Sequence, residues 1–108
     1  MKEYNFEGNL IKVGQNASEN TFLVKNSDPS YIWVHLESFP SCHVIIETSE
    51  PSPATISYAM NICLQNSKYK DIKYIKASVT KVSNLKCTES LGVVEFKSNR
   101  QVSSFFTK

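Results

Sequence analysis

Hydrophobic and polar positions alternate most strictly in one stretch of the chain, from residue 31 to residue 48. Its first half places Ile32, Val34 and Leu36 on one side, which predicts a β-strand with one buried face. A second hydrophobic run follows a segment containing Pro40, and such a segment favours a loop. We therefore predict an antiparallel hairpin whose facing pairs are Leu36 with Val44, Val34 with Ile46, and Ile32 with Thr48.

The register of this hairpin also decides what its opposite face carries. A slip of one residue would exchange the two faces and scatter the aliphatic side chains, so the pairing is well specified. The opposite face, which we expect to point outward, carries Trp33, His35, Glu37, His43, Ile45 and Glu47. An indole and two imidazoles on an outward face have to be explained.

Two helices and several further strands are expected around the hairpin. A capping-box pattern that begins at Asn16 predicts a short helix over about residues 17–25. Pro53 follows a serine that can act as N-cap, and it fits the first position of a longer helix over about residues 53–67. The remaining strand-like segments are residues 6–13, folded around Gly8-Asn9, and residues 72–82, 92–96 and 102–107.

These elements predict a single α+β domain over residues 1–108 with a mostly antiparallel, mixed sheet and the longer helix on one face. A chain of 108 residues is large enough for one hydrophobic core and too small for two. No hydrophobic run is long enough to span a membrane, and the first residues lack the apolar segment of a secretory signal. Three cysteines without paired spacing favour reduced thiols and a cytoplasmic location.

Charge is unevenly distributed along the chain. Residues 1–65 hold three lysines and seven acidic residues, whereas residues 66–108 hold eight lysines and one arginine against three acidic residues. This asymmetry indicates an anionic partner for the second half, or lysines that solubilise a small sheet and protect its edge. Arginine is scarce, so we expect any nucleic-acid contacts to be made mostly with phosphates.

Metal binding and catalysis are weakly supported. His35, His43 and a carboxylate of the same face could bind iron or zinc, but neighbours on a flat strand pair splay apart instead of converging. Cys42 and His43 are adjacent in the sequence, so in a strand their side chains diverge and do not pair as nucleophile and base. The sequence contains no nucleophile elbow and no phosphate-binding glycine loop. We expect a protein without enzymatic activity, metal or cofactor.

A nucleic-acid surface is the third possibility. Unpaired RNA is typically held by aromatic side chains that stack on bases and by lysines that contact phosphates. Trp33 and His35 could form the aromatic platform, and residues 68–86 carry most of the lysines. In the alternative interpretation Trp33 is covered by the short helix or another element, and His35 is bonded to backbone.

Several segments, taken in order, resemble the NFACT-R domain family. Residues 13–20 (VGQNASEN) are similar to its VGrNAxeN motif, residues 32–35 (IWVH) to its DxWfH strand, and residues 40–46 (PSCHVII) to its PGSHVvi strand. The further matches are the helix ending in Ser67-Lys68 and the segments 83–86 and 92–96.

This resemblance implies a nucleic-acid-binding α+β module without known catalysis. Domains of this family occur at the carboxyl end of ribosome quality-control factors that engage tRNA and the large ribosomal subunit, and in smaller proteins followed by a coiled coil. Neither the amino-terminal domain nor the coiled coil is present in this sequence. We therefore expect a stand-alone module, to which peptide-tailing activity is not carried over.

The chain departs from the family pattern at four positions. Tyr31 stands where the family usually has Asp, Ser41-Cys42 replace Gly-Ser, and Gln15 holds a position that is often basic. The change at Gln15 weakens a phosphate contact at the first motif. The loss of the glycine implies a different loop conformation before His43, because glycine adopts backbone angles that serine does not.

We predict a non-enzymatic RNA-binding module whose partner is tRNA or ribosomal RNA, with the ribosome itself as a possible partner and no membrane contact. The alternative is a protein-interaction or DNA-binding module that keeps the fold without binding tRNA. The residues expected at the RNA are Asn16, Asn20, Trp33, His35, His43, Lys68, Lys73, Lys76, Lys81 and Lys86.

Overall fold

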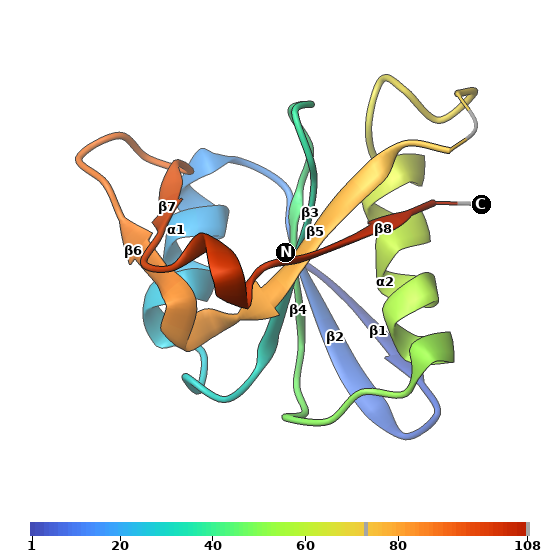
Figure 1. Ribbon diagram of the computed structural model, residues 1–108, viewed down its shortest axis with the longest axis horizontal. Coiled ribbons are helices and arrows are strands. Elements are labelled where there is room, and N and C mark those ends of the chain that lie inside the picture. The colour runs from blue at the N-terminus through green and yellow to red at the C-terminus, as the bar shows by residue number, and fades with distance from the viewer. Residues whose placement is uncertain (73, 108) are drawn as a thin grey trace.

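The computed structural model describes residues 1–72 and 74–107. Figure 1 shows the elements along the chain. In order they are β1 (Lys2–Phe6), β2 (Asn9–Gly14), α1 (Ala17–Asn26), β3 (Ile32–Leu36), β4 (His43–Ile46), α2 (Pro53–Gln65), β5 (Lys76–Lys81), β6 (Leu85–Cys87), β7 (Val94–Phe96) and β8 (Ser103–Phe106), with short 3-10 helices at Val82–Asn84 and Asn99–Gln101.

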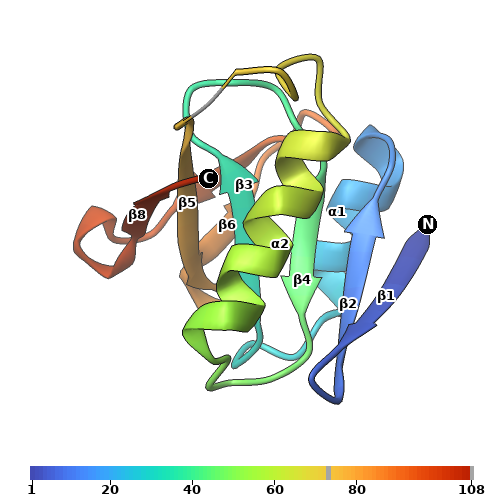
Figure 2. The ribbon, with the colours of Figure 1, turned by 90° about the vertical axis from the view of Figure 1, so that its right-hand side faces the viewer.

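The six longer strands form one sheet with the order β1-β2-β4-β3-β5-β8, and β6 and β7 pair as a separate hairpin. Every neighbouring pair in the described sheet is antiparallel. In Figure 1 the sheet stands between α2 on one side and α1 with the β6–β7 hairpin on the other, and Figure 2 shows α2 lying across its face. The prediction of an α+β domain with a longer and a shorter helix is confirmed.

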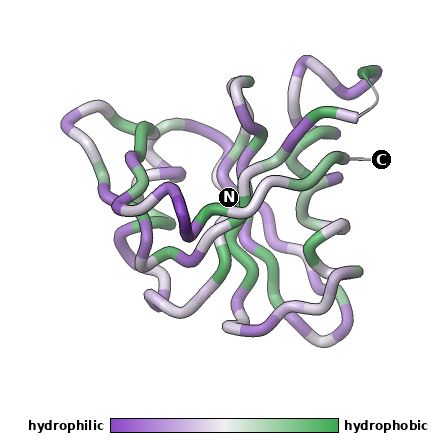
Figure 3. Tube along the Cα trace, in the orientation of Figure 1, coloured by the Kyte–Doolittle hydropathy of each residue, from purple (hydrophilic) through white to green (hydrophobic). Residues whose placement is uncertain are grey.

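The face of the sheet under α2 holds the larger hydrophobic core. Alternating strand residues such as Val34, Leu36, Val44 and Ile46 are sealed from solvent there, as the period of two predicted. The helix begins where Ser52 accepts the N–H of Thr55, and Pro53 follows at the first helical position. In Figure 3 the hydrophobic segments follow the central strands and recur along α2.

The opposite face of the sheet is also covered. Its core combines residues of α1, the central hairpin and the β6 region: Leu23, Val24, Trp33, Ile45, Val82 and Leu85. The sequence did not predict β6 as a strand, although residues 92–96 were predicted to form the strand that contains β7. No helix in the described part of the chain is long and apolar enough to cross a membrane.

The central hairpin pairs two residues away from the predicted register. Ile32 faces Ile46 and Val34 faces Val44, so the predicted partners are wrong while the faces are right, because a shift of two residues preserves them. Beyond the last ladder pair, the hydroxyl of Ser41 accepts the backbone N–H of Leu36 over 3.1 Å.

The predicted amino-terminal hairpin is confirmed, but its turn lies one residue earlier than predicted. Strands β1 and β2 are joined at Glu7 and Gly8, whose φ angles are 51° and 79°, instead of at Gly8-Asn9. Two successive residues with positive φ match the tight turn whose twist suits a hairpin.

Candidate nucleic-acid interface

The aromatic face of the central hairpin is buried. Trp33 and His43 are only 2% and 3% exposed. The indole Nε1–H of Trp33 donates a hydrogen bond to Nδ1 of His43 over 3.0 Å, and the ring of Phe96 from β7 packs edge-on against the indole. The expectation that this face points outward is therefore wrong, because α1 and the β6–β7 hairpin cover it. Neither Trp33 nor His43 is accessible for stacking on a base in this structure.

His35 lies at the border of this cluster and is half-buried. Its ring stacks on Trp33 with the planes 3° apart, and it meets the edge of His43 with the centroids 4.9 Å apart. It lines a cavity of about 450 Å³ together with Phe39 and Ser78. We call this hollow the histidine cavity. Of the three predicted rings, His35 is the one that lies partly open at this hollow.

Both imidazoles are electrically neutral at physiological pH. Burial, followed by repulsion from His35, lowers the pKa of His43 to about 4. Burial also lowers the pKa of His35. A neutral ring on His43 agrees with its Nδ1 accepting the indole hydrogen, since that nitrogen must carry a lone pair. The histidines therefore supply shape and polarity to the site but no positive charge for phosphates.

A second hollow, of about 550 Å³, gathers the segments that resemble the family motifs. The end of β2 and the start of α1 contribute residues 13–17, the β3–β4 loop contributes residues 40–42, and the chain after α2 contributes residues 66–69. Residues 91 and 92 of the β6–β7 loop also line it. We call this hollow the motif cavity. It adjoins the histidine cavity, because Pro40 and Gly92 line both.

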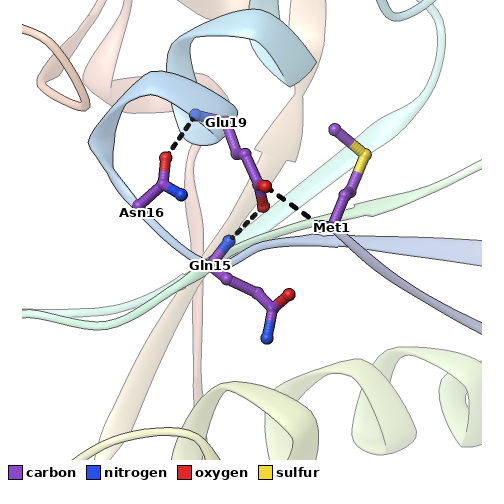
Figure 4. A network of polar contacts seen from close by, with 4 residues as sticks. All are labelled: Met1, Gln15, Asn16 and Glu19. Carbon is purple, nitrogen blue, oxygen red and sulfur yellow. Dashed lines mark hydrogen bonds and ion pairs between the residues drawn. The ribbon is translucent and has the colours of Figure 1, made fainter.

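The amino terminus of α1 forms one wall of the motif cavity. Asn16 Oδ1 accepts the N–H of Glu19 over 2.9 Å, and the Glu19 carboxylate accepts the N–H of Gln15 and pairs with the terminal ammonium of Met1, as Figure 4 shows. The predicted capping box is confirmed, with the Gln15 N–H as its second donor. The Gln15 N–H, more than any other group, holds the pKa of Glu19 below its ordinary value. The Oδ1 atom of Asn16 thus caps the helix, and its Nδ2 group is left to bind other partners.

Asn20 connects three elements beneath the same cavity. Its Oδ1 accepts the backbone N–H of His43 over 3.2 Å, which ties α1 to the first residue of β4. A Cβ atom on Gly14 would lie 2.2 Å from this oxygen, so glycine alone fits at the end of β2. The first family-like motif therefore builds the cavity wall through a glycine that allows Asn20 to approach closely.

The predicted lysines that the structure describes do not form one surface. Lys68 lines the motif cavity. Lys76 and Lys81 are the first and last residues of β5, so they lie at opposite ends and on opposite faces of the strand. Lys86 lies on β6, on the other side of the sheet from α2 (Figure 1). Lys73 lies outside the described residues. Among the predicted lysines that the structure describes, Lys68 is the one that lines either cavity.

The carboxylates considered as metal ligands beside the histidines have other partners. Glu47 forms an ion pair with Lys12 over 3.2 Å, and Glu37 accepts a hydrogen bond from Ser104. Within residues 1–72 and 74–107, no three His, Cys, Asp or Glu side chains converge in a way that could hold a metal ion.

The thiol of Cys42 faces α2 instead of a histidine. A hydrogen bond with Cys63 lowers the pKa of Cys42, and burial raises the pKa of Cys63. Cys63 Sγ also lies 3.6 Å from the carbonyl oxygen of Val34. The arrangement does not pair Cys42 with an imidazole base.

Two contributors to the motif cavity were missed in the sequence. Tyr69 follows Ser67-Lys68 in the segment after α2, and Phe39 packs against its ring with the centroids 4.6 Å apart. Gly92 has a φ of 78° and donates its N–H to Thr21 of α1 over 2.7 Å. With only three glycines in the chain, the positions of Gly14 and Gly92 were the available signal for close backbone approach.

The family model described as NFACT protein RNA binding domain matches residues 3–98, a range that contains every segment of the motif cavity. The Rqc2 homolog RqcH of Bacillus subtilis (strain 168) is 35% identical over 80 residues, which are 73% of this chain and 14% of that protein. The chain thus spans a small part of the curated relative that it matches.

A solved structure shares the fold. The C-terminal part of the fibronectin/fibrinogen-binding protein from Streptococcus suis superposes with a TM-score of 0.87 over 97% of this chain and 43% of that chain, at 19% identity. The fold, the assembled motifs and the match over residues 3–98 agree, and the chain belongs to the NFACT RNA-binding domain family.

Proposed function

We propose that this protein is a non-catalytic RNA-binding module that recognises tRNA or ribosomal RNA in ribosome quality control. Membership of a family of RNA-binding domains supports RNA as the ligand. The similarity to an Rqc2 homolog supports the process, although this chain covers only 14% of that protein.

The observation that carries the proposal is the chemistry of the motif cavity. The described residues that line it include the side-chain amides of Gln15, Asn16, Asn20 and Asn66, and the ammonium group of Lys68, but no carboxylate. Hydrogen-bond donors and a cation without competing acids suit a polyanion. The remaining lysines of the second half add attraction over a longer range, which should weaken as salt increases.

The proposal is tested by fluorescence anisotropy with labelled tRNA, a ribosomal RNA fragment and double-stranded DNA of matched length, each at several salt concentrations. We expect tighter binding to RNA than to DNA, because the cavity adds contacts that bare electrostatics does not provide. The variant Lys68→Gln should weaken RNA binding by about fivefold to tenfold. The control Lys25→Gln removes an exposed lysine at the far end of α1 and should change affinity much less.

Equal affinity for RNA and DNA with the same salt dependence would contradict recognition of RNA and leave only non-specific attraction. A preference for tRNA over the ribosomal fragment, or the reverse, would identify the class of RNA. His35→Ala should also weaken RNA binding if the histidine cavity takes part, since that ring lines it.

A protein-interaction role is the second candidate, and the edge strand β8 favours it. Phe105 and Phe106 are 44% and 56% exposed on this outermost strand. Sheet edges can accept a further strand from a partner. Sedimentation of the purified protein with and without Phe106→Ser would reveal self-association through this edge.

A further inference from the structure

The motif cavity presents fixed donors rather than interchangeable amides. Asn16 and Asn20 each accept a backbone N–H through Oδ1, from Glu19 and from His43. A backbone N–H can only donate, so the oxygen of each amide must face it and the Nδ2 group must point elsewhere. The orientation of both side chains is therefore determined by hydrogen bonding.

The Nδ2 group of Asn20 opens into the cavity. Asn20 is nine-tenths buried and lines the motif cavity. Among the described residues, no acceptor bonds to this nitrogen. Every fully buried side-chain nitrogen among them does have a partner, so the Nδ2 group of Asn20 is not fully buried and keeps contact with solvent. Since Asn20 lines the motif cavity, we place that contact in the cavity. A donor on a nearly buried side chain that has no acceptor in the protein is available to a ligand.

The other walls add an aromatic ring and a cation. Tyr69 lines the cavity, and Phe39, which does not line it, holds the ring from the side of the histidine cavity. Lys68 precedes Tyr69 and lines the same hollow. A ring, amide donors and an ammonium group are the groups that proteins use for a base, its polar edge and its phosphate.

A hollow of this kind suits an unpaired base better than a duplex. Its volume of about 550 Å³ is lined by the α1 amino terminus, the β3–β4 loop, the segment after α2 and the β6–β7 loop. In a double helix the bases are stacked inside and only backbone and groove edges are presented, whereas an unpaired base can turn outward into a pocket.

We infer that the motif cavity binds one unpaired nucleotide of the RNA, with the base against Tyr69, base or phosphate oxygens on the Nδ2 groups of Asn16 and Asn20, and the phosphate at Lys68. This inference rests on the proposed function and specifies which part of an RNA this cavity takes. The ligand is then a loop, a bulge or a single-stranded end.

Two substitutions test the donors without removing their structural bonds. Asn16→Asp and Asn20→Asp keep an oxygen for the backbone N–H, and aspartate caps helices as well as asparagine does. Each replaces the NH₂ donor by a negatively charged acceptor in the cavity. Asn61→Asp introduces the same change on an exposed position of α2 and serves as the matched control.

The probes are an RNA hairpin with a seven-nucleotide loop and a blunt duplex with the same stem. We expect the hairpin to bind about tenfold more tightly than the duplex, and Asn16→Asp to abolish that difference while Asn61→Asp preserves it. Tyr69→Leu should reduce the difference, and Tyr69→Phe should retain it because the ring remains. In wild-type protein, the side-chain NH₂ resonances of Asn16 and Asn20 should shift when the hairpin is added but not when the duplex is added.

Equal affinity for hairpin and duplex, with unchanged asparagine resonances, would overturn the nucleotide site while RNA binding itself remained. The same conclusion follows if Asn16→Asp and Asn61→Asp weaken hairpin binding equally. Failure of every RNA to bind would reject the proposed function together with this site. The NMR measurement uses the unaltered protein, so a variant that does not fold does not prevent the test.

Discussion

The two faces of the central sheet are covered by different chemistry. Under α2, the side chains of Val34 and Val44 pack among other aliphatic groups in a core built by hydrophobic contact. Under α1 and the β6–β7 hairpin, Trp33 donates to His43, and the backbone of His43 donates to Asn20. One face is closed by non-directional packing and the other by packing combined with a chain of directional bonds.

This difference relates stability to the site. The hydrogen-bonded face is the one that holds the α1 amino terminus, the β3–β4 loop and the β6–β7 loop in place, and these segments line both cavities. Disturbance there should affect RNA binding as well as folding. Disturbance of the aliphatic face should affect folding first, because most of its core residues, Val34, Val44 and Ile46 among them, line neither cavity.

The largest expected effect is the loss of Trp33. Trp33→Ala should lower the free energy of unfolding by about 3–5 kcal/mol, since it opens a void and leaves His43 Nδ1 without its donor. On the aliphatic face, Leu36→Ala should cost about 2–5 kcal/mol by cavity formation alone. Urea unfolding followed by far-UV circular dichroism measures both.

Conservative variants separate the two faces more sharply. Trp33→Phe keeps an aromatic ring but removes the indole donor, so we expect a loss of about 1–3 kcal/mol. Leu36→Met conserves volume and should cost less than about 1.5 kcal/mol. If the two conservative variants proved equally mild, the directional bond would contribute nothing beyond packing.

A fall in pH should weaken the hydrogen-bonded face. The pKa of His43 is about 4, below its ordinary value of 6.5, so the folded state binds fewer protons than the unfolded state. The stability linked to this ring is fully present above about pH 6.5 and is lost as the pH falls toward about 4. The total loss in the free energy of unfolding is roughly 3 kcal/mol. The lowered pKa of His35 acts in the same direction.

Urea unfolding at several pH values between 7.5 and 4.5 measures this loss. The variant His43→Asn offers an oxygen to the indole in place of Nδ1 but does not titrate, so its stability should change much less over the same range. If the wild-type protein and His43→Asn showed the same pH dependence, the loss would have to come from other groups.

The fold could be predicted where a short-range pattern was sufficient. The period of two identified which hairpin residues face the helix, and Asn16 and Pro53 marked the starts of both helices. The same pattern did not show that the second face would be covered, because that depends on β6 and β7 returning from far along the chain. The register was predicted wrongly because a shift of two residues keeps the same side chains on each face, so alternation alone does not distinguish the two pairings.

The site was predicted in part for similar reasons. Asn16, Asn20 and Lys68 line one cavity, although Lys68 is far from the two asparagines in the sequence. The resemblance of their segments to family motifs was the signal that selected them. The burial of Trp33 and the separation of the lysines depend on the three-dimensional path of the chain, which composition does not determine. Tyr69 gave no signal, since a tyrosine among lysines is as compatible with a surface as with a pocket.

The smallest expected effect compares the starts of the two helices. Asn16→Ala removes the cap of α1, and Ser52→Ala removes the cap of α2; each should cost about 1 kcal/mol of unfolding free energy. Ser52 also donates to Glu7, and this contact lies at the end of α2 remote from the motif cavity. The two variants should therefore lose similar stability but differ in RNA affinity. Asn16→Ala should weaken the affinity for RNA measured by anisotropy, whereas Ser52→Ala should leave that affinity unchanged. If both variants weakened RNA binding to the same degree, affinity would follow global stability, and the separate roles of the two faces would have to be abandoned.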